Sequence, residues 1–433
     1  MAETNQVGPA PAITLKITGG KDFSGNFEKL EWASFINSGY IVRAKVIDPY
    51  FAILEDLAAD KYLEKGRVEP TQLEFAINWV DGPATEKRKA YLAYLNGRGV
   101  VENARLEFIG IDPPSWWLNA GDADGSVWGK GDPHGTDSGR ISDVIKSVIK
   151  KYYISRDKST NPGPSSKVSD TDDSKENLWW MMKMDPKTFI SSLLEWSSSI
   201  TPKKSAWVVA SVDHEIKIKE MNSLPDDLPA NKKDFGVFNV NTNMPGAGDI
   251  KKIEILANNV ISVFQTKLIT QGISTISGQF IDKITQKKKV SVEDENTSAK
   301  LNTNIGPDRG FKKPDSKTDW ATSVHMVPEF SAGDLGMAYV DYIDGRARTM
   351  FMDMLNMVMR LRVRVNGDYR FDDSSILGAS TLTLSWKDHP DEKPYFLSGK
   401  WIIYGFHHIV TRVNWWTDLY LYRIDYDAAA KKL

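Results

Sequence analysis

The sequence predicts a β-rich α+β protein in which two β modules, each with one packed helix, are separated by a helical and irregular middle region. Short runs of alternating apolar and polar residues dominate the first hundred and the last hundred residues. Amphipathic helical spacing occurs between these blocks, followed by polar stretches rich in Pro and Gly. The predicted organisation has five parts: a flexible tail at 1–11, a first β module at 12–115, a loop and helical region at 116–205, an insertion of mixed β structure with loops at 206–320, and a second β module at 321–433.

The first module is predicted from strands packed around one helix. Apolar residues at helical spacing indicate a helix over 51–65, which Gly66 terminates. Pro113 and Pro114 close the module. Period-two alternation indicates its strands at 12–18, 40–48, 72–80 and 100–111.

Two helices are predicted in the middle region. Apolar residues recur over 141–152 at the spacing of one helix face, and Asp137 or Ser138 is positioned as the N-cap. Asp185 followed by Pro186 predicts the start of the second helix, since proline is favoured at the first helical position.

The remainder of the middle region is predicted as loops and short strands. Residues 115–136 are rich in Gly, Asp and Trp and indicate an ordered loop, and residues 156–177 have the composition of a mobile linker. Strands are predicted at 207–212, 215–219, 250–264 and 266–284, and an exposed loop at 305–319.

The second module begins with a predicted helix over 345–359 that leads directly into a strand at 360–365. Asn366 and Gly367 form the strongest short hairpin signal in the chain. Further strands are predicted at 381–386, 400–410 and 417–426.

Composition narrows the possible functions. The 433 residues contain no Cys, which excludes disulfides, thiolate zinc sites, iron–sulfur clusters and a cysteine nucleophile. The 55 basic and 57 acidic residues nearly balance, which argues against a dedicated nucleic-acid binder. No segment has the 18 consecutive apolar residues of a membrane span, and residues 1–11 lack the pattern of a signal peptide, so we expect folding in a cytoplasm.

The sequence contains no recognisable catalytic or cofactor motif. The acidic stretch at 122–125 lacks the spacing of a calcium loop, and the acidic pairs, including Asp372 and Asp373, are predicted on solvated faces. His407 and His408 are adjacent on a strand, so one of them is expected to be buried and hydrogen-bonded. The other histidines are predicted at the surface: His134, His214, His325 and His389. We therefore predict no catalytic residue, metal ligand or cofactor, and no enzymatic activity.

Two groups of residues are candidates for an interface. The alternating Arg360, Arg362 and Arg364 share one strand face. Three interpretations are open: the arginines line a channel, pair with carboxylates of a partner, or face solvent. The chain has 14 Trp, and three pairs are adjacent, so they are either buried within the chain or form an intersubunit or carbohydrate-contacting surface. The pairs are Trp116 with Trp117, Trp179 with Trp180, and Trp415 with Trp416.

Four stretches carry a resemblance to a known family. The segments 396–410 (FLSGKWIIYGFHHIV) and 416–423 (WTDLYLYR) resemble the closing hairpin of the baseplate hub proteins of contractile bacteriophage tails. These hubs are related to the hub portion of type VI secretion spikes. Residues 32–49, 139–145 and 184–190 are similar to an early strand and to two helix starts of the same family.

This resemblance implies two tail-tube-like β-barrels in each chain and a homotrimer that presents six barrels as a ring. Such a ring adapts a six-fold tail tube to a three-fold central spike. The implied partners are the spike, the tube or its initiator, baseplate wedge proteins, and a tape measure protein in the lumen, through which DNA passes without specific recognition. The implied location is the tail baseplate of a virion assembled in the host cytoplasm.

Two alternatives remain open at this point. One is the corresponding hub of a contractile secretion or injection system, which shares the architecture. The other is a glycan-binding β-protein that uses the tryptophan pairs as stacking platforms.

Overall fold

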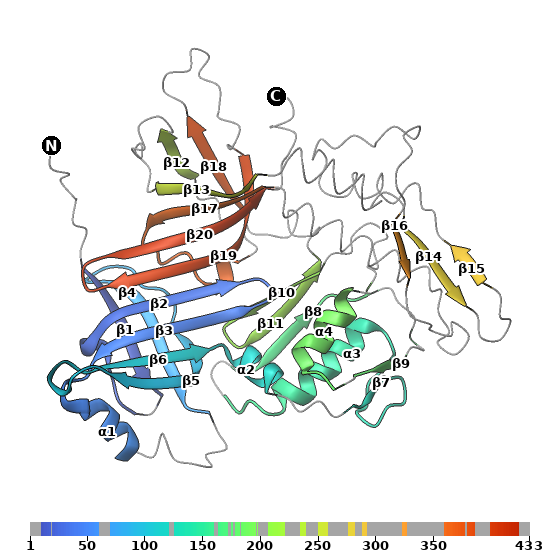
Figure 1. Ribbon diagram of the computed structural model, residues 1–433, viewed down its shortest axis with the longest axis horizontal. Coiled ribbons are helices and arrows are strands. Elements are labelled where there is room, and N and C mark those ends of the chain that lie inside the picture. Colours follow the sequence, from blue (N-terminus) through green and yellow to red (C-terminus); the bar gives the residue numbers. More distant parts are fainter. Residues whose placement is uncertain are drawn as a thin grey trace.

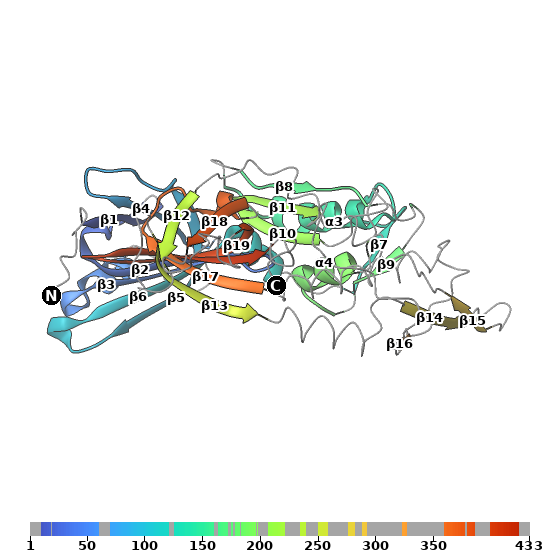
Figure 2. The same ribbon diagram turned by 90° about the horizontal axis from the view of Figure 1, so that it is seen from above.

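The computed structural model has a β-rich fold with few helices (Figure 1). Its largest sheet combines strands from both ends of the chain, and α3 (Ile141–Ile149) and α4 (Pro186–Glu195) lie beyond one end of it in both views (Figures 1 and 2). The structure describes residues 10–18, 20–59, 70–120, 125–159, 163–171, 175, 178–181, 183–195, 197, 207–220, 234–239, 250–258, 276–281, 288–291, 323–326, 359–376, 379–385 and 399–423.

The large sheet is antiparallel along its main path, with a branch of two strands. Its order is β1-β4-β5-β6-β3-β2-β19-β20-β17-β13, and β12 and β18 form the branch beside β19. The N-terminal strands are β1 (Pro11–Ile17), β2 (Phe27–Phe35), β3 (Gly39–Ile47), β4 (Gln72–Trp79), β5 (Arg88–Arg98) and β6 (Arg105–Ile111). The later strands are β12 (Asp234–Asn239), β13 (Ile250–Asn258), β17 (Met359–Asn366), β18 (Ala379–Ser385), β19 (Gly399–Thr411) and β20 (Trp415–Arg423).

Shorter elements surround this sheet. The other helices are α1 (Ala52–Ala59) and α2 (Pro113–Asn119), and α3 continues into a π-turn at Lys150–Ile154. The 3-10 turns lie at Ser24–Asn26, Pro49–Phe51, Val101–Asn103 and Asp373–Ser375. The smaller sheets contain β7 (Val127–Gly129) with β9 (Leu178–Trp180); β8 (Ser165–Val168), β10 (Trp207–Val212) and β11 (Glu215–Glu220); and β14 (Ile276–Ile281), β15 (Lys288–Ser291) and β16 (Ser323–Met326).

The two β modules meet where β2 pairs with β19. This antiparallel pairing places Trp32 opposite His408, and a hairpin flanks it on each side: β2–β3 and β19–β20. Gly405 lies opposite Phe35, and a Cβ at Gly405 would overlap the ring of Phe35. The absence of a side chain at this position therefore lets the two strands and the Phe35 ring fit together.

One face of the joined sheet is the core. Trp32 is fully buried and makes edge-to-face contacts with Phe75 and Phe406, at centroid distances of 5.2 and 5.1 Å. Apolar residues from both modules alternate inward around it, as period two requires: Leu30, Val42, Ala44, Leu106, Phe108, Leu361, Val363, Val410, Leu419 and Leu421. The two modules thus share one hydrophobic core.

Several sequence predictions are confirmed. Strands form at or near the predicted positions in β1, β3, β4, β10, β11, β13 and β17–β20, and α4 begins at Pro186 after its Asp185 cap, which accepts the backbone N–H of Thr188. Helix α1 confirms part of the helix predicted over 51–65. The amphipathic helix also forms, although Arg140 occupies the N-cap position and Ser138 instead donates a hydrogen bond to Asp143.

Other predictions are wrong. Helix α2 begins at Pro113, directly after β6 ends at Ile111, and Asp112 caps it by accepting the N–H of Ser115. The predicted loop at 115–136 therefore contains α2 and β7, and the predicted linker at 156–177 contains β8, which pairs with β11. Asn366 and Gly367 do not form a tight hairpin, since β17 pairs with β13 and β20.

Some predictions concern residues outside the described ranges. These are residues 1–9 of the tail predicted at 1–11, residues 345–358 of the helix predicted at 345–359, the exposed loop at 305–319 and His389. Pro11, the last residue of the predicted tail, begins β1. Among the described strands no closed barrel forms, because both modules belong to one open path of strands. The two-barrel form implied by the family resemblance stays a prediction.

Replacing Trp32 with Ala should lower the free energy of unfolding by about 3–5 kcal/mol, because it removes a large buried side chain that contacts both modules and leaves a cavity. Chemical denaturation measures this change. Val413→Ala is the matched control, since Val413 is 69% exposed, and it should change stability by less than about 0.5 kcal/mol. Equal effects of the two substitutions would contradict a shared core centred on Trp32.

Candidate functional site: the junction of the two β modules

The junction contains a buried histidine that links three segments of the second module. His408 of β19 is fully buried on the core side of the sheet, and its ring centroid lies 5.4 Å from that of Trp32. Trp415 Nε1 donates to His408 Nδ1 over 3.1 Å, so His408 Nε2 carries the proton and donates to the carbonyl of Phe371. Thr417 also contacts Nδ1, at 2.8 Å. This neutral tautomer confirms the prediction that one of the two adjacent histidines is buried and hydrogen-bonded.

Burial lowers the pKa of His408 to about 4, because the charged imidazolium would lose its hydration and Nδ1 already faces an N–H donor. The neighbouring His407 is partly exposed on the opposite face of β19, with Nε2 3.7 Å from a carboxylate oxygen of Glu31. The two adjacent histidines therefore occupy chemically different sides of the sheet, as strand geometry requires.

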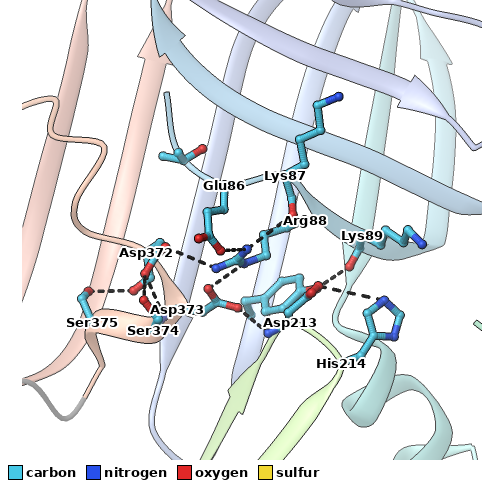
Figure 3. A network of polar contacts seen from close by, with 12 residues as sticks. Glu86, Lys87, Arg88, Lys89, Asp213, His214, Asp372, Asp373, Ser374 and Ser375 are labelled. Atoms are coloured by element: carbon cyan, nitrogen blue, oxygen red, sulfur yellow. Dashed lines mark hydrogen bonds and ion pairs between the residues drawn. The ribbon is translucent and has the colours of Figure 1, made fainter. Parts of the chain in front are cut away.

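A buried ion-pair network joins the first module, the middle region and the second module (Figure 3). Arg88 of β5 donates from Nε to Asp373 over 2.7 Å and also contacts Asp372 at 3.2 Å. The other oxygen of Asp373 accepts the backbone N–H of Asp213 in the β10–β11 turn over 2.5 Å. One carboxylate thus connects parts of the chain that are 285 and 160 residues apart.

The charges in this network are unbalanced. Burial would lower the pKa of Arg88, but Asp373, Glu86 and Asp372 raise it above its ordinary value, so Arg88 is a permanent cation. Burial raises the pKa of Asp373 to about 6, although the positive charge of Arg88 lowers it. The negative charge of Asp372 raises the pKa of Asp373 further. Removal of Arg88 would leave buried carboxylates without their counter-ion.

A second buried polar cluster holds the helical region against the first module. Tyr91 of β5 donates to Asp157 over 2.8 Å, and Tyr153 donates to the carbonyl of His214. His214 is 1% exposed, with Nδ1 3.6 Å from Asp157. The prediction of a surface position for His214 is therefore wrong: the β10–β11 turn directs it inward. Burial would raise the pKa of Asp157, but the nearby imidazole of His214 and hydrogen bonds from Ser159 and Tyr91 lower it overall.

The structure places the three predicted interface arginines on the outward face of β17. Arg364 makes a two-bond ion pair with Asp418 of β20, at 2.6 and 2.7 Å, and Arg362 pairs with Glu254 of β13. Arg360 lies over the ring of Tyr404, 5.3 Å from its centroid. Pairs within the chain therefore engage Arg362 and Arg364, and the role of the three in an interface stays a prediction.

The predicted tryptophans occupy different environments. Trp116 and Trp117 lie on α2, not on a strand; both are half-buried and make edge-to-face contacts with Tyr91. Trp415 is buried against Trp79, at a centroid distance of 5.0 Å, whereas Trp416 is half-buried on the outward face of β20. Of the third pair, Trp179 is half-buried and Trp180 is 62% exposed.

The ion-pair network is not predicted by the sequence. Asp372 and Asp373 were predicted on a solvated face, and the structure instead buries both beside Arg88. No local pattern distinguishes this acidic pair from a solvated one, because its partner lies almost the whole length of the chain away. Across the described ranges, no group of three or more His, Asp or Glu side chains is arranged to hold a metal ion, and no helix is long and apolar enough to cross a membrane.

Comparisons with known proteins give structural similarity without sequence similarity. No protein-family model and no curated protein sequence matches the chain. The tail protein from Neisseria meningitidis MC58 superposes with a TM-score of 0.53 at 9% identity, covering 97% of this chain and 98% of that chain. The 43 kDa tail protein of prophage MuSo2 from Shewanella oneidensis gives a TM-score of 0.51 at 10% identity, covering 96% and 99%.

The Francisella PdpA-VgrG complex, in its lidded form, is a further structural neighbour. It gives a TM-score of 0.50 at 11% identity and covers 96% of this chain but 53% of that chain, so this chain spans about half its length. The chain thus has the fold of phage tail proteins and of VgrG-type spike-related proteins, which confirms the resemblance predicted from its sequence.

Replacing Arg88 with Met should lower the free energy of unfolding by about 3–5 kcal/mol, because it leaves the buried carboxylate of Asp373 unpaired. Adding Asp373→Asn to this variant should recover part of the loss. Denaturant unfolding measures both changes. Arg105→Met, at a pair with Glu28 whose arginine side chain is 52% exposed, is the control and should cost at most about 1 kcal/mol. If Arg88→Met costs no more than this control, the network does not join the modules.

Acid should weaken the protein through His408. The unfolded chain takes up a proton near pH 6.5, whereas folded His408 does so only near pH 4, so the contribution of this residue to stability is lost as pH falls through that window. The loss approaches about 3 kcal/mol at pH 4. The measurement is the free energy of unfolding between pH 7 and 4 for the natural chain and for His408→Gln. The difference between the two should shrink with falling pH; parallel profiles would contradict the buried neutral imidazole.

Proposed function

We propose that this protein is the structural hub of a contractile phage tail baseplate, a trimeric ring that adapts a six-fold tail tube to a three-fold central spike. The observation that carries the proposal is the single sheet in which β2 and β19 join two β modules side by side. Three copies of such a chain supply six modules, which suits a component placed between six-fold and three-fold neighbours. The similarity to phage tail proteins over nearly their whole length supports this role.

The proposal extends to closure of the modules into tube-like barrels within the ring, and to an absence of catalytic activity. Its partners are the spike, the tail tube or its initiator, and the wedge proteins around the ring. A tape measure protein occupies the lumen before DNA passes through it. The protein is then a component of the virion tail, assembled in the host cytoplasm.

A secretion-type hub is the second candidate, favoured by one observation. A chain of the Francisella PdpA-VgrG complex has a comparable fold over 96% of this chain, with a TM-score of 0.50. Both candidates require the same ring, and they differ in what the ring is attached to.

Size-exclusion chromatography with light scattering should show three copies of the 48.6 kDa chain, alone or after addition of the central spike protein. Electron microscopy of the same sample should show a ring with three-fold symmetry and six similar lobes. A chain that stays monomeric alone and with spike and tube proteins would contradict the hub proposal. Co-purification with tail sheath and tail tube proteins from virions separates the phage role from the secretion role.

A further inference from the structure

The buried ion-pair network contains more acidic groups than basic ones. One guanidinium, that of Arg88, is shared by three carboxylates (Figure 3). Its Nε donates to Asp373 over 2.7 Å, its Nη2 contacts Asp372 at 3.2 Å, and its Nη1 donates to Glu86 over 2.9 Å. The side chain of Glu86 is 79% exposed, whereas those of Asp372 and Asp373 are 10% and 0% exposed. When both aspartates are ionised, the buried part of this network therefore holds two negative charges and one positive charge.

Asp213 adds a further carboxylate to the group. Its backbone N–H donates to Asp373 over 2.5 Å, and Figure 3 shows its side chain beside His214. The Oδ1 atom of Asp213 is buried and has no hydrogen-bond partner among the described residues, since His214 Nε2 is 4.0 Å away. Burial raises the pKa of Asp213, although His214 and Arg88 lower it. The carboxyl group of Asp213 is therefore easier to protonate than an exposed one.

The other polar groups that face the network do not supply the missing positive charge. Lys89 lowers the pKa of Asp213, but Figure 3 shows its ammonium group directed away from the carboxylates. Tyr40 is fully buried and donates its O–H to the carbonyl of Lys89, and burial together with nearby carboxylates keeps its pKa well above the ordinary value, so it stays neutral. His214 lies between two carboxylates, with Nδ1 3.6 Å from Asp157 and Nε2 4.0 Å from Asp213. Any charge on His214 is therefore shared with a carboxylate outside the network.

A proton from solvent supplies this charge. Burial raises the pKa of Asp373 to about 6, whereas an aspartate in an unfolded chain has a pKa of about 3.9. Between these two pH values the folded chain binds a proton that the unfolded chain does not bind. The folded state therefore gains stability through Asp373 as pH falls from 7 toward 4, and loses that gain as pH rises through 6.

We propose that the network is a proton-sensitive joint, in which one proton bound by the buried carboxylates tightens the contact of β5 with the β10–β11 turn and with the Asp373–Ser375 turn. The proton neutralises one of several carboxylates that a single guanidinium cannot balance. Because the joint connects the first module, the middle region and the second module, mild acid holds these three parts together more firmly than neutral solution does. The inference is independent of the trimer and of the hub proposal.

Denaturant unfolding of the full chain between pH 7 and pH 4 tests the joint. Asp373→Asn keeps the shape of the carboxyl group and removes its titration. The ratio of the unfolding constants, natural chain over variant, should fall by about fiftyfold from pH 7 to pH 4. His408 has the opposite pH dependence, but it is present in both chains, so its effect cancels in this ratio. Asp170→Asn, which removes a carboxylate that is 57% exposed, is the control, and the same ratio should change by less than about twofold.

Hydrogen exchange of the Asp213 amide tests the joint without a variant, because this N–H donates directly to Asp373. Opening of the joint exposes Asp373 to water and releases its proton, so the protection factor of this amide should rise by about tenfold or more as pH falls from 7 to 5. The same amide should show no such rise in Asp373→Asn.

Asp372→Asn distinguishes the cluster from Asp373 alone. It keeps Asp373 and removes the neighbouring negative charge, so proton uptake should shift to lower pH. Parallel stability profiles of the natural chain and Asp373→Asn overturn the proposal. An Asp213 amide whose protection factor in the natural chain is the same at pH 7 and pH 5 also overturns it.

Discussion

The pairing of β2 with β19 is the constraint on which the rest of the structure depends. It joins strands whose partnered residues are nearly 380 positions apart, such as Trp32 and His408. Closing so long a loop costs entropy, which only burial of a large shared surface can offset. The Trp32 cluster provides that burial on one side of the pair, and Gly405 permits the close packing of Phe35 on the other.

Polar contacts fix the relative position of the parts that this core holds together. Arg88 of the first module, Asp213 of the middle region and Asp373 of the second module meet in one buried network. Such a network adds less stability than its bonds suggest, because each buried charge loses its hydration. Its geometric demands nevertheless favour a single arrangement of the three parts. The proposed ring would require that kind of rigidity, because each copy would have to match neighbours on several sides.

The sequence predicts the helices and strands better than it predicts which strands pair. Alternation identified β3 and β19, and Asp185 with Pro186 marked the start of α4, because these signals are local. Helix α2 was not predicted, although Asp112 followed by Pro113 has the same pattern of a cap and an early proline that marked α4. The hairpin predicted at Asn366 does not form, because β17 pairs with β13 and β20 and not with the strand that follows it in the chain.

The candidate site shows the same limit. That one of two adjacent histidines is buried follows from strand geometry, whereas the choice of His408 depends on Phe371, Trp415 and the opposing β2 strand. No local sequence pattern indicates the ion pair of Arg88 with Asp373, because the two residues are 285 positions apart.

Native-state hydrogen exchange of β2 and β19 tests most directly whether the two modules form one cooperative unit. We expect the backbone amides of both strands to be among the slowest to exchange and to open together, with the same dependence on denaturant. Fast exchange of β19 while β2 stays protected would contradict it, because the modules would then open independently.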